Sequence, residues 1–196
     1  TLQITAWNTR CKPSEERVMG ILPFFHVYGM TCVLNYSMYT SGALILMPRF
    51  DVRQAVKAID RYAPTFFPGA PTIYVAINAH PQIHRYDLKS IQACISGAAP
   101  LLSNVQQTFA DLTGGATLVE GYGLTEASPV THCNPLEQGN IIGSIGLPLP
   151  DTQAKIVDPA NPKRKLPPGI AGELAVKGPQ VMKGYWRNPQ ETSRVL

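Results

Sequence analysis

A short segment near the middle of the chain combines side chains that could bind a nucleotide and its metal ion. Residues 120–129 read EGYGLTEASP, with two glycines, one tyrosine, one threonine and two carboxylates. The Tyr122 ring could stack on an aromatic base, and the Thr125 hydroxyl could donate to a phosphate oxygen. Glu126 could supply an oxygen ligand to Mg²⁺, which takes one or two carboxylates and keeps several waters. The alternative is a glycine-rich turn with a surface glutamate.

Small residues would let a ligand approach the main chain closely in two places. Gly121 and Gly123 permit positive φ and close backbone approach on either side of the tyrosine. A second stretch, residues 96–100, reads SGAAP and contains three residues with almost no side chain, namely Gly97, Ala98 and Ala99. A planar ligand could lie on this backbone and use its N–H and C=O groups. Tight packing of a strand end onto the following helix explains the same residues equally well.

The four histidines differ in what their surroundings allow. His26 follows an apolar run and could border an acyl or aromatic substrate pocket, although a histidine packed among its neighbours explains the position equally well. His132 follows Glu126 closely enough to lie near the same site, whereas His80 and His84 flank a proline in a polar connector. The chain has no GxSxG elbow, no HExxH motif and no recognisable Cys/His pair, so nothing supports a hydrolase or a metalloprotease.

The elements that must position these residues alternate between short apolar runs and helical patterns. Strands are predicted at residues 17–25, 42–48, 64–69, 90–97 and 116–123. Helices are predicted at residues 30–39, 51–62, 70–79 and 102–112, the second of them capped by Asp51. Apolar strands separated by helices indicate a parallel sheet covered on both faces. Ligands bind beyond the carboxyl ends of such strands, where residues 24–29, 96–100 and 120–126 would meet.

The character of the sequence changes after Ala127. Residues 143–159 and 172–178 have short alternating patterns typical of strands, and residues 160–169 form a turn-rich connection that holds a basic cluster. We therefore predict an α/β fold, with a parallel sheet covered by helices over residues 1–140. A short β-rich segment, part of an incomplete barrel, would follow over residues 141–196. A solvated turn explains the basic cluster more simply than a nucleic-acid partner does.

Composition excludes several other classes of protein. The chain has 196 residues, of which 44% are hydrophobic and 15% are charged, so it should fold into one globular unit with an appendage. No apolar stretch approaches the roughly 20 residues that a membrane-spanning helix needs. The net charge of +4 is spread out, and the four cysteines form no CxxC pair. A reducing, cytoplasmic setting is therefore expected.

Six ordered segments together resemble one known family. They read LPFFHVYG, PGAPTIY, CISGAAPL, EGYGLTEASPVTH, GSIGLPLPDT and PPGIAGELAVKGPQVMKGYWRNPQET, and they extend from about residue 20 to the end of the chain. In this order they are similar to the adenylate-forming superfamily of acyl-CoA synthetases, peptide-synthetase adenylation domains and luciferases. The fourth and sixth segments look most like bacterial long-chain fatty-acid–CoA ligases.

The resemblance implies a two-step reaction and a role for each matching residue. A fatty acid and ATP·Mg²⁺ would give acyl-AMP and pyrophosphate, and coenzyme A would then displace AMP. Thr125 and Glu126 would be catalytic, Glu126 as the magnesium ligand. The nucleotide would contact Gly97, Ala98, Ala99, Glu120, Gly121, Tyr122, Gly123, Leu124 and Thr125. His26 would lie beside the carboxylate end of the acyl pocket, with Gly69 near the channel.

The chain also departs from the family pattern, and this leaves alternatives open. It lacks the family's upstream phosphate loop and its C-terminal domain, and it does not begin with Met, so we expect a central segment of a longer protein with little turnover alone. Fatty acid, ATP and coenzyme A are the expected partners, with peripheral membrane contact as a further option. An aryl or other acid could replace the fatty acid, and a non-catalytic nucleotide-binding module is also compatible. Acyl chain length and oligomeric state do not follow from the sequence.

Overall fold

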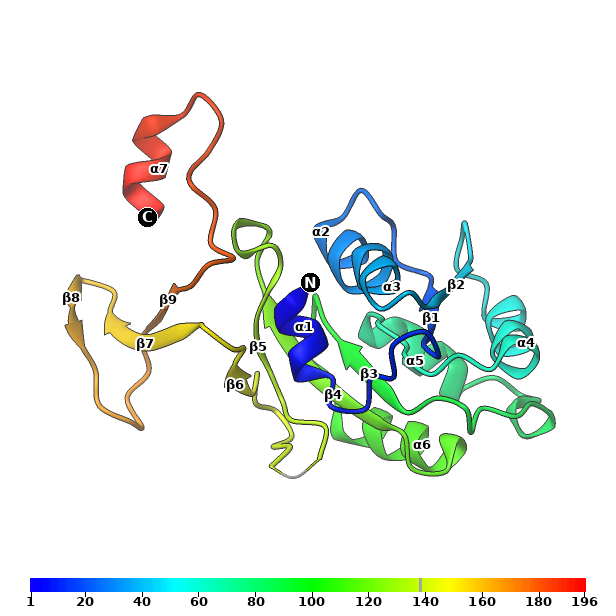
Figure 1. Ribbon diagram of the computed structural model, residues 1–196. Coiled ribbons are helices and arrows are strands. Elements are labelled where there is room, and N and C mark those ends of the chain that lie inside the picture. Colours follow the sequence, from blue (N-terminus) through cyan, green and yellow to red (C-terminus); the bar gives the residue numbers. More distant parts are fainter. Residues whose placement is uncertain (138) are drawn as a thin grey trace.

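The computed structural model describes residues 1–137 and 139–196 (Figure 1). The strands are β1 (Arg17–Gly20), β2 (Ala43–Leu46), β3 (Ala93–Ser96), β4 (Thr117–Gly123), β5 (Val130–Cys133), β6 (Leu147–Pro148), β7 (Gln153–Asp158), β8 (Asn161–Lys165) and β9 (Glu173–Lys177). The helices are α1 (Leu2–Trp7), α2 (Val27–Gly29), α3 (Tyr36–Tyr39), α4 (Val52–Tyr62), α5 (Pro71–Asn78), α6 (Ser103–Thr113) and α7 (Pro189–Val195). Three further helical turns are η1 (Met30–Asn35), η2 (Ile83–Arg85) and η3 (Thr125–Ala127).

Parallel strands form the central layer, as the sequence predicted. β1 pairs in parallel with β2, and β3 pairs in parallel with β4. Phe66 joins the two pairs, because it forms parallel bridges to Val18 on one side and to Ala93 on the other. The expected strand at residues 64–69 is wrong in detail: the segment forms only isolated bridges, since its two prolines have no N–H for a ladder. β1 likewise ends at Gly20 rather than at residue 25.

Hydrophobic side chains fill both faces of this layer. Neighbouring residues along a strand point to opposite faces, and the two core clusters divide accordingly. Met19, Cys94 and Leu118 belong to the cluster formed with α4, α5 and α6. Their neighbours in the strands, Val18, Ala93, Ile95 and Val119, belong to the cluster formed with α1, η1 and α3. The sheet is therefore covered on both faces, which confirms the predicted α/β class (Figure 1).

The helix boundaries follow the signals in the sequence. The Asp51 side chain caps α4 by accepting a hydrogen bond of 2.9 Å from the Gln54 N–H. Ala55, Val56 and Ile59 are buried on one face of α4, as their spacing predicted. Within the described ranges, no helix is both long enough and apolar enough to cross a membrane.

β4 matches the strand predicted at residues 116–123, whereas the loop expected at residues 120–126 is shorter than predicted. Residues 120–123 continue β4, and from Gly121 onward this strand pairs antiparallel with β5. The turn between the two strands spans only residues 124–129. Gly121 and Gly123 do not use the positive φ that glycine permits, because both lie in extended strand. Only their close approach to neighbouring main chain or side chains is confirmed.

The C-terminal part is a separate antiparallel sheet with strand order β8, β7, β9. It extends away from the α/β layer and does not close into a barrel (Figure 1). The connection expected at residues 160–169 contains β8, whose five residues, including the basic cluster Lys163, Arg164 and Lys165, are all exposed. The boundary that we placed at residue 140 remains a prediction.

Candidate nucleotide site

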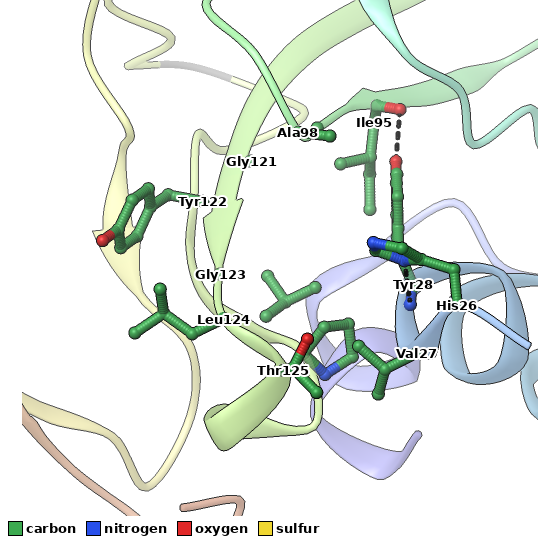
Figure 2. Close-up of a pocket in the computed structure, with 13 residues that line it drawn as sticks. His26, Val27, Tyr28, Ile95, Ala98, Gly121, Tyr122, Gly123, Leu124 and Thr125 are labelled. Carbon is green, nitrogen blue, oxygen red and sulfur yellow. Dashed lines mark hydrogen bonds between the residues drawn. The ribbon is translucent and has the colours of Figure 1, made fainter. Parts of the chain in front are cut away.

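One cavity lies beyond the carboxyl ends of β3 and β4 and draws on three separate segments (Figure 2). Its volume is about 140 Å³. Pockets for small ligands typically enclose about 300–1,000 Å³, so these walls would surround only part of a nucleotide. The lining comprises His26, Val27, Tyr28, Ile95, Gly97, Ala98, Gly121, Tyr122, Gly123, Leu124, Thr125, Pro129 and Val130. Most of the residues singled out from the sequence therefore meet at one place.

Tyr28 forms one wall of this cavity and is held rigidly. Its hydroxyl donates a hydrogen bond of 2.7 Å to the Ile95 carbonyl oxygen at the end of β3. The side chain is only 7% exposed, and burial raises the pKa of the phenol well above its ordinary value, so the group is neutral. A Cβ added to Gly97 would lie 3.1 Å from the Tyr28 ring. Glycine at this position therefore lets the chain after β3 pass closely over the tyrosine.

The segment after β3 turns sharply at Ala98. This residue has a φ of 72°, which is uncommon for a residue other than glycine. The preceding Gly97 N–H donates 3.1 Å to the Gly69 carbonyl oxygen. Gly97 and Ala98 line the cavity, whereas Ala99 and Gly69 do not. Backbone close to a cavity wall is the arrangement that a flat ligand would need.

His26 stands at the mouth of the cavity as the N-cap of α2. Its Nδ1 accepts a hydrogen bond of 3.1 Å from the Tyr28 N–H, which fixes the ring and leaves Nε2 on the outer side of the imidazole. The side chain is exposed rather than packed in a core. Of the two interpretations that the sequence left open, this placement favours the residue bordering a pocket.

The β4–β5 hairpin forms the opposite wall. Figure 2 shows the side chains of Tyr122, in β4, and Leu124, just after it, projecting to the side away from Tyr28. The Leu124 N–H donates 2.8 Å to the Pro129 carbonyl oxygen, and this bond closes the turn that carries Thr125 and Glu126. Thr125 lines the cavity just after the end of the strand, and the residue is exposed.

Glu126 lies beside the cavity but does not line it. Its Oε1 accepts a hydrogen bond of 2.7 Å from the Tyr185 hydroxyl. This bond favours the charged form and so lowers the pKa of Glu126 below its ordinary value. The described residues hold no group of three or more metal-binding side chains. A single carboxylate near exposed hydroxyls nevertheless fits Mg²⁺, which completes its shell with phosphate oxygens and waters.

Other residues predicted from the sequence lie outside the cavity. Glu120 is in β4, where its Oε2 accepts from the Leu101 N–H at 3.2 Å. Gly69 is separated from the cavity by Tyr28, and Ala99 lies just past the residues that line it. His132 lies behind Tyr122, with ring centroids 6.4 Å apart, and its Nδ1 is 2.9 Å from the Thr131 hydroxyl oxygen.

Two tyrosines at the site had no predicted role. Tyr28 stands two residues after His26, and the spacing of a helix cap could have indicated that its N–H meets the histidine. Tyr185 is 59 residues from its partner Glu126 in the sequence, and no local pattern reveals such a contact.

Comparisons with known proteins identify the family of this chain. The sequence profile of a family described as AMP-binding enzyme matches residues 1–186. The chain is 51% identical over 196 residues to a long-chain-fatty-acid–CoA ligase of Bacillus subtilis, covering all of this chain and 35% of that protein. It is 38% identical over 186 residues to a ligase of the same name from Escherichia coli, covering 94% of this chain and 32% of that protein.

The fold is also found in solved structures. The crystal structure of ATP-bound MatB from Rhodopseudomonas palustris matches 98% of this chain and 37% of that one, with a TM-score of 0.87 and 31% identity. The chain thus spans about a third of the length of the relatives it matches.

Proposed function

Because the chain belongs to the family of AMP-binding enzymes, we propose that it is a segment of an AMP-forming acid–CoA ligase that activates fatty acids. The observation that carries the proposal is the cavity that brings together His26, Gly97, Ala98 and residues 121–125. The names of the two relatives above favour a long-chain fatty acid as the substrate.

The proposed reaction has two steps. A carboxylate oxygen of the fatty acid attacks the α-phosphorus of ATP, and the bond to pyrophosphate breaks to give acyl-AMP. The thiol of coenzyme A then attacks the acyl carbonyl carbon, loses its proton, and AMP leaves. The first step makes the second possible, because AMP is a far better leaving group than the oxygen of a free carboxylate. Mg²⁺ would neutralise charge on the phosphates.

The residues of this chain would bind and orient the nucleotide. The adenine would lie along the backbone at Gly97, Ala98 and Ala99, with Tyr122 stacked on the ring. The other predicted contacts of the nucleotide are Glu120, Gly121, Gly123 and Leu124. The Thr125 hydroxyl would donate to a phosphate oxygen, and Glu126 would hold the metal ion.

The acid would enter from the side of His26. The Tyr28 N–H holds the His26 imidazole through Nδ1, so the Nε2 atom could contact the carboxylate that attacks the phosphate. Gly69 and the residues near it would border the acyl channel. Residues 24–30 (FFHVYGM), where the family's amino-acid binders usually carry an acidic partner for the ammonium group, are largely apolar and contain no Asp or Glu, which disfavours an amino acid as the substrate. An aryl acid is the second candidate, with less support than a fatty acid.

The setting of the enzyme follows from these substrates. Fatty acid, ATP and coenzyme A are all the partners that the reaction requires, and nucleic acid has no role in it. We propose a cytoplasmic enzyme that contacts the membrane surface peripherally to collect its apolar substrate.

The test is acid-dependent exchange between ATP and labelled pyrophosphate, catalysed by the full-length protein. The panel contains medium and long fatty acids, an aryl acid and several amino acids. We expect exchange with fatty acids and, on addition of coenzyme A, formation of the thioester. Exchange with the aryl acid alone would move the second candidate to first place. No exchange with any acid would refute the ligase and favour a non-catalytic nucleotide-binding module.

A further inference from the structure

The chain after β9 returns to the turn that carries Glu126 and makes two hydrogen bonds to that residue. The Met182 N–H donates 2.7 Å to the Glu126 carbonyl oxygen. The Tyr185 hydroxyl donates 2.7 Å to Glu126 Oε1. The first bond fixes the backbone of the turn, and the second reaches the carboxylate itself. A part of the chain far away in sequence therefore determines how this side chain is presented.

Tyr185 is itself held by contacts that do not involve Glu126. Its N–H donates 2.9 Å to the hydroxyl oxygen of Thr192 in α7. That hydroxyl donates in turn 2.8 Å to the Asn188 carbonyl oxygen, and the Asn188 side chain caps α7 by accepting from the Glu191 N–H. The backbone of Tyr185 is thus anchored to a capped helix. The anchored backbone therefore holds the Tyr185 phenol next to the Glu126 carboxylate.

Only one of the two carboxylate oxygens is engaged in this way. Among the described residues, no second side chain donates to Glu126. A carboxylate on a flexible side chain can rotate, and a hydrogen bond to one oxygen restricts that rotation. The Oε2 atom therefore has no side-chain donor among the described residues.

We propose that Tyr185 is a positioning residue that holds the Glu126 carboxylate in one orientation, with Oε1 bound to the phenol and Oε2 turned to the Mg²⁺ that accompanies ATP. The inference rests on the proposed function, in which Glu126 is the magnesium ligand. It adds a partner for that ligand and links the β-rich part of the chain to the phosphate end of the site. Partners of this kind typically change metal affinity or activity by about 10–100-fold when they are removed.

The test uses Tyr185→Phe in the full-length protein, which removes the hydroxyl and keeps the ring. Tyr39→Phe is the matched control, since Tyr39 is 56% exposed and its hydroxyl makes no hydrogen bond within the described residues. The first measurement is ATP–pyrophosphate exchange as a function of Mg²⁺ concentration at saturating ATP and acid. We expect the apparent KM for Mg²⁺ to rise on the order of tenfold in Tyr185→Phe. The rate at saturating Mg²⁺ should stay within about twofold of wild type, and Tyr39→Phe should change neither.

Two further readouts do not depend on turnover. The dissociation constant of Mn²⁺, measured by electron paramagnetic resonance with a non-hydrolysable ATP analogue, should rise in parallel with the KM. Hydrogen exchange of the backbone over residues 178–188 should stay close to wild type, because the bonds from Met182 and to Thr192 remain. If exchange in this segment accelerates and the rate falls at all Mg²⁺ concentrations, Tyr185 only fastens the segment and the positioning role is wrong.

Glu126→Gln in the same assays separates this inference from the function on which it rests. If Glu126→Gln raises the KM for Mg²⁺ while Tyr185→Phe leaves it and the Mn²⁺ affinity unchanged, only the positioning role is refuted. If Glu126→Gln also leaves metal binding unchanged, Glu126 is not the ligand, and both statements are overturned.

Discussion

Gly123 offers the sharpest test of how the fold builds the site. It lies in β4 beside the irregularity in the β4–β5 ladder, and a Cβ placed there would meet main chain rather than side chain. That Cβ would lie 2.7 Å from the Pro129 carbonyl carbon and 2.9 Å from Val130 Cα, and it would be closer still to the Pro129 oxygen. Alanine at this position therefore forces the two strands apart.

The size of the effect follows from these contacts. Because ordinary Cβ contacts are 3.4–4 Å, the β5 main chain must move by roughly 1 Å. Overpacking of this kind costs about 1–3 kcal/mol, and loss of the Leu124–Pro129 hydrogen bond adds about 0.5–1.5 kcal/mol. The restricted unfolded state of alanine offsets about 0.4–1 kcal/mol of this. The net loss in the free energy of unfolding is about 0.5–4 kcal/mol.

The loss of catalytic rate should be larger than the loss of folded protein alone would cause. The displaced bond closes the turn that carries Thr125 and Glu126, and a misplacement of about 1 Å can cost on the order of 100-fold in rate. The assay is ATP–pyrophosphate exchange by Gly123→Ala in the full-length protein, together with its thermal unfolding midpoint. Gly20→Ala in β1 is the control, since its Cβ would lie 3.2 Å from the Ile45 carbonyl oxygen and Gly20 does not line the cavity. If Gly123→Ala is as stable and as active as Gly20→Ala, the close approach of the strands does not shape the site.

Three further predictions concern single side chains. Glu126→Gln should lower Mg²⁺-dependent exchange by on the order of 100-fold while the thermal midpoint stays near wild type, and a wild-type rate would remove the metal role. Burial lowers the pKa of His132 in the folded protein below its value of about 6.5 in the unfolded chain. As the pH falls below about 6.5, the unfolded chain therefore binds a proton that the folded protein does not. Stability declines until the pH drops below the pKa of His132 in the folded protein. The thermal midpoint should therefore fall less steeply between pH 7 and pH 5 in His132→Gln, whereas equal slopes would show that the imidazole does not titrate in this way. Iodoacetamide should label the half-buried Cys11 before the three buried cysteines, as followed by peptide mapping with mass spectrometry. Burial raises the pKa of the Cys32 thiol to about 12, so labelling of Cys32 at the same rate as Cys11 would contradict the packing.

The parallel layer was predictable because its signals are local. Apolar strands such as β3 and caps such as Asp51 depend on residues within a few positions of one another. The same logic failed for residues 64–69, where apolar side chains suggested a strand but two prolines removed the donors that a ladder needs. It also failed for β8, because a basic and proline-containing stretch can still pair when both of its faces are exposed.

The site was predictable in its parts but not in its connections. Residues 97–98 and 121–125 stood out by their composition, and the rule for ligands at the carboxyl ends of parallel strands placed them together. The bond between Tyr185 and Glu126 joins residues 59 positions apart, and the bond between Tyr28 and Ile95 joins residues 67 apart. Such contacts depend on the packed fold, so a single sequence does not reveal them. The positions of Glu120 and Ala99 outside the cavity depend on the same packing.

The central claim is that the cavity between β3, β4 and α2 holds the nucleotide of an acid–CoA ligase. The most direct measurement is a crystal structure of the full-length protein with a non-hydrolysable acyl-adenylate analogue. The account predicts the adenine against the backbone of residues 97–99 with Tyr122 on its face, and the phosphate oxygen within hydrogen-bond distance of the Thr125 hydroxyl. A nucleotide bound elsewhere, with this cavity filled by protein side chains, would contradict it.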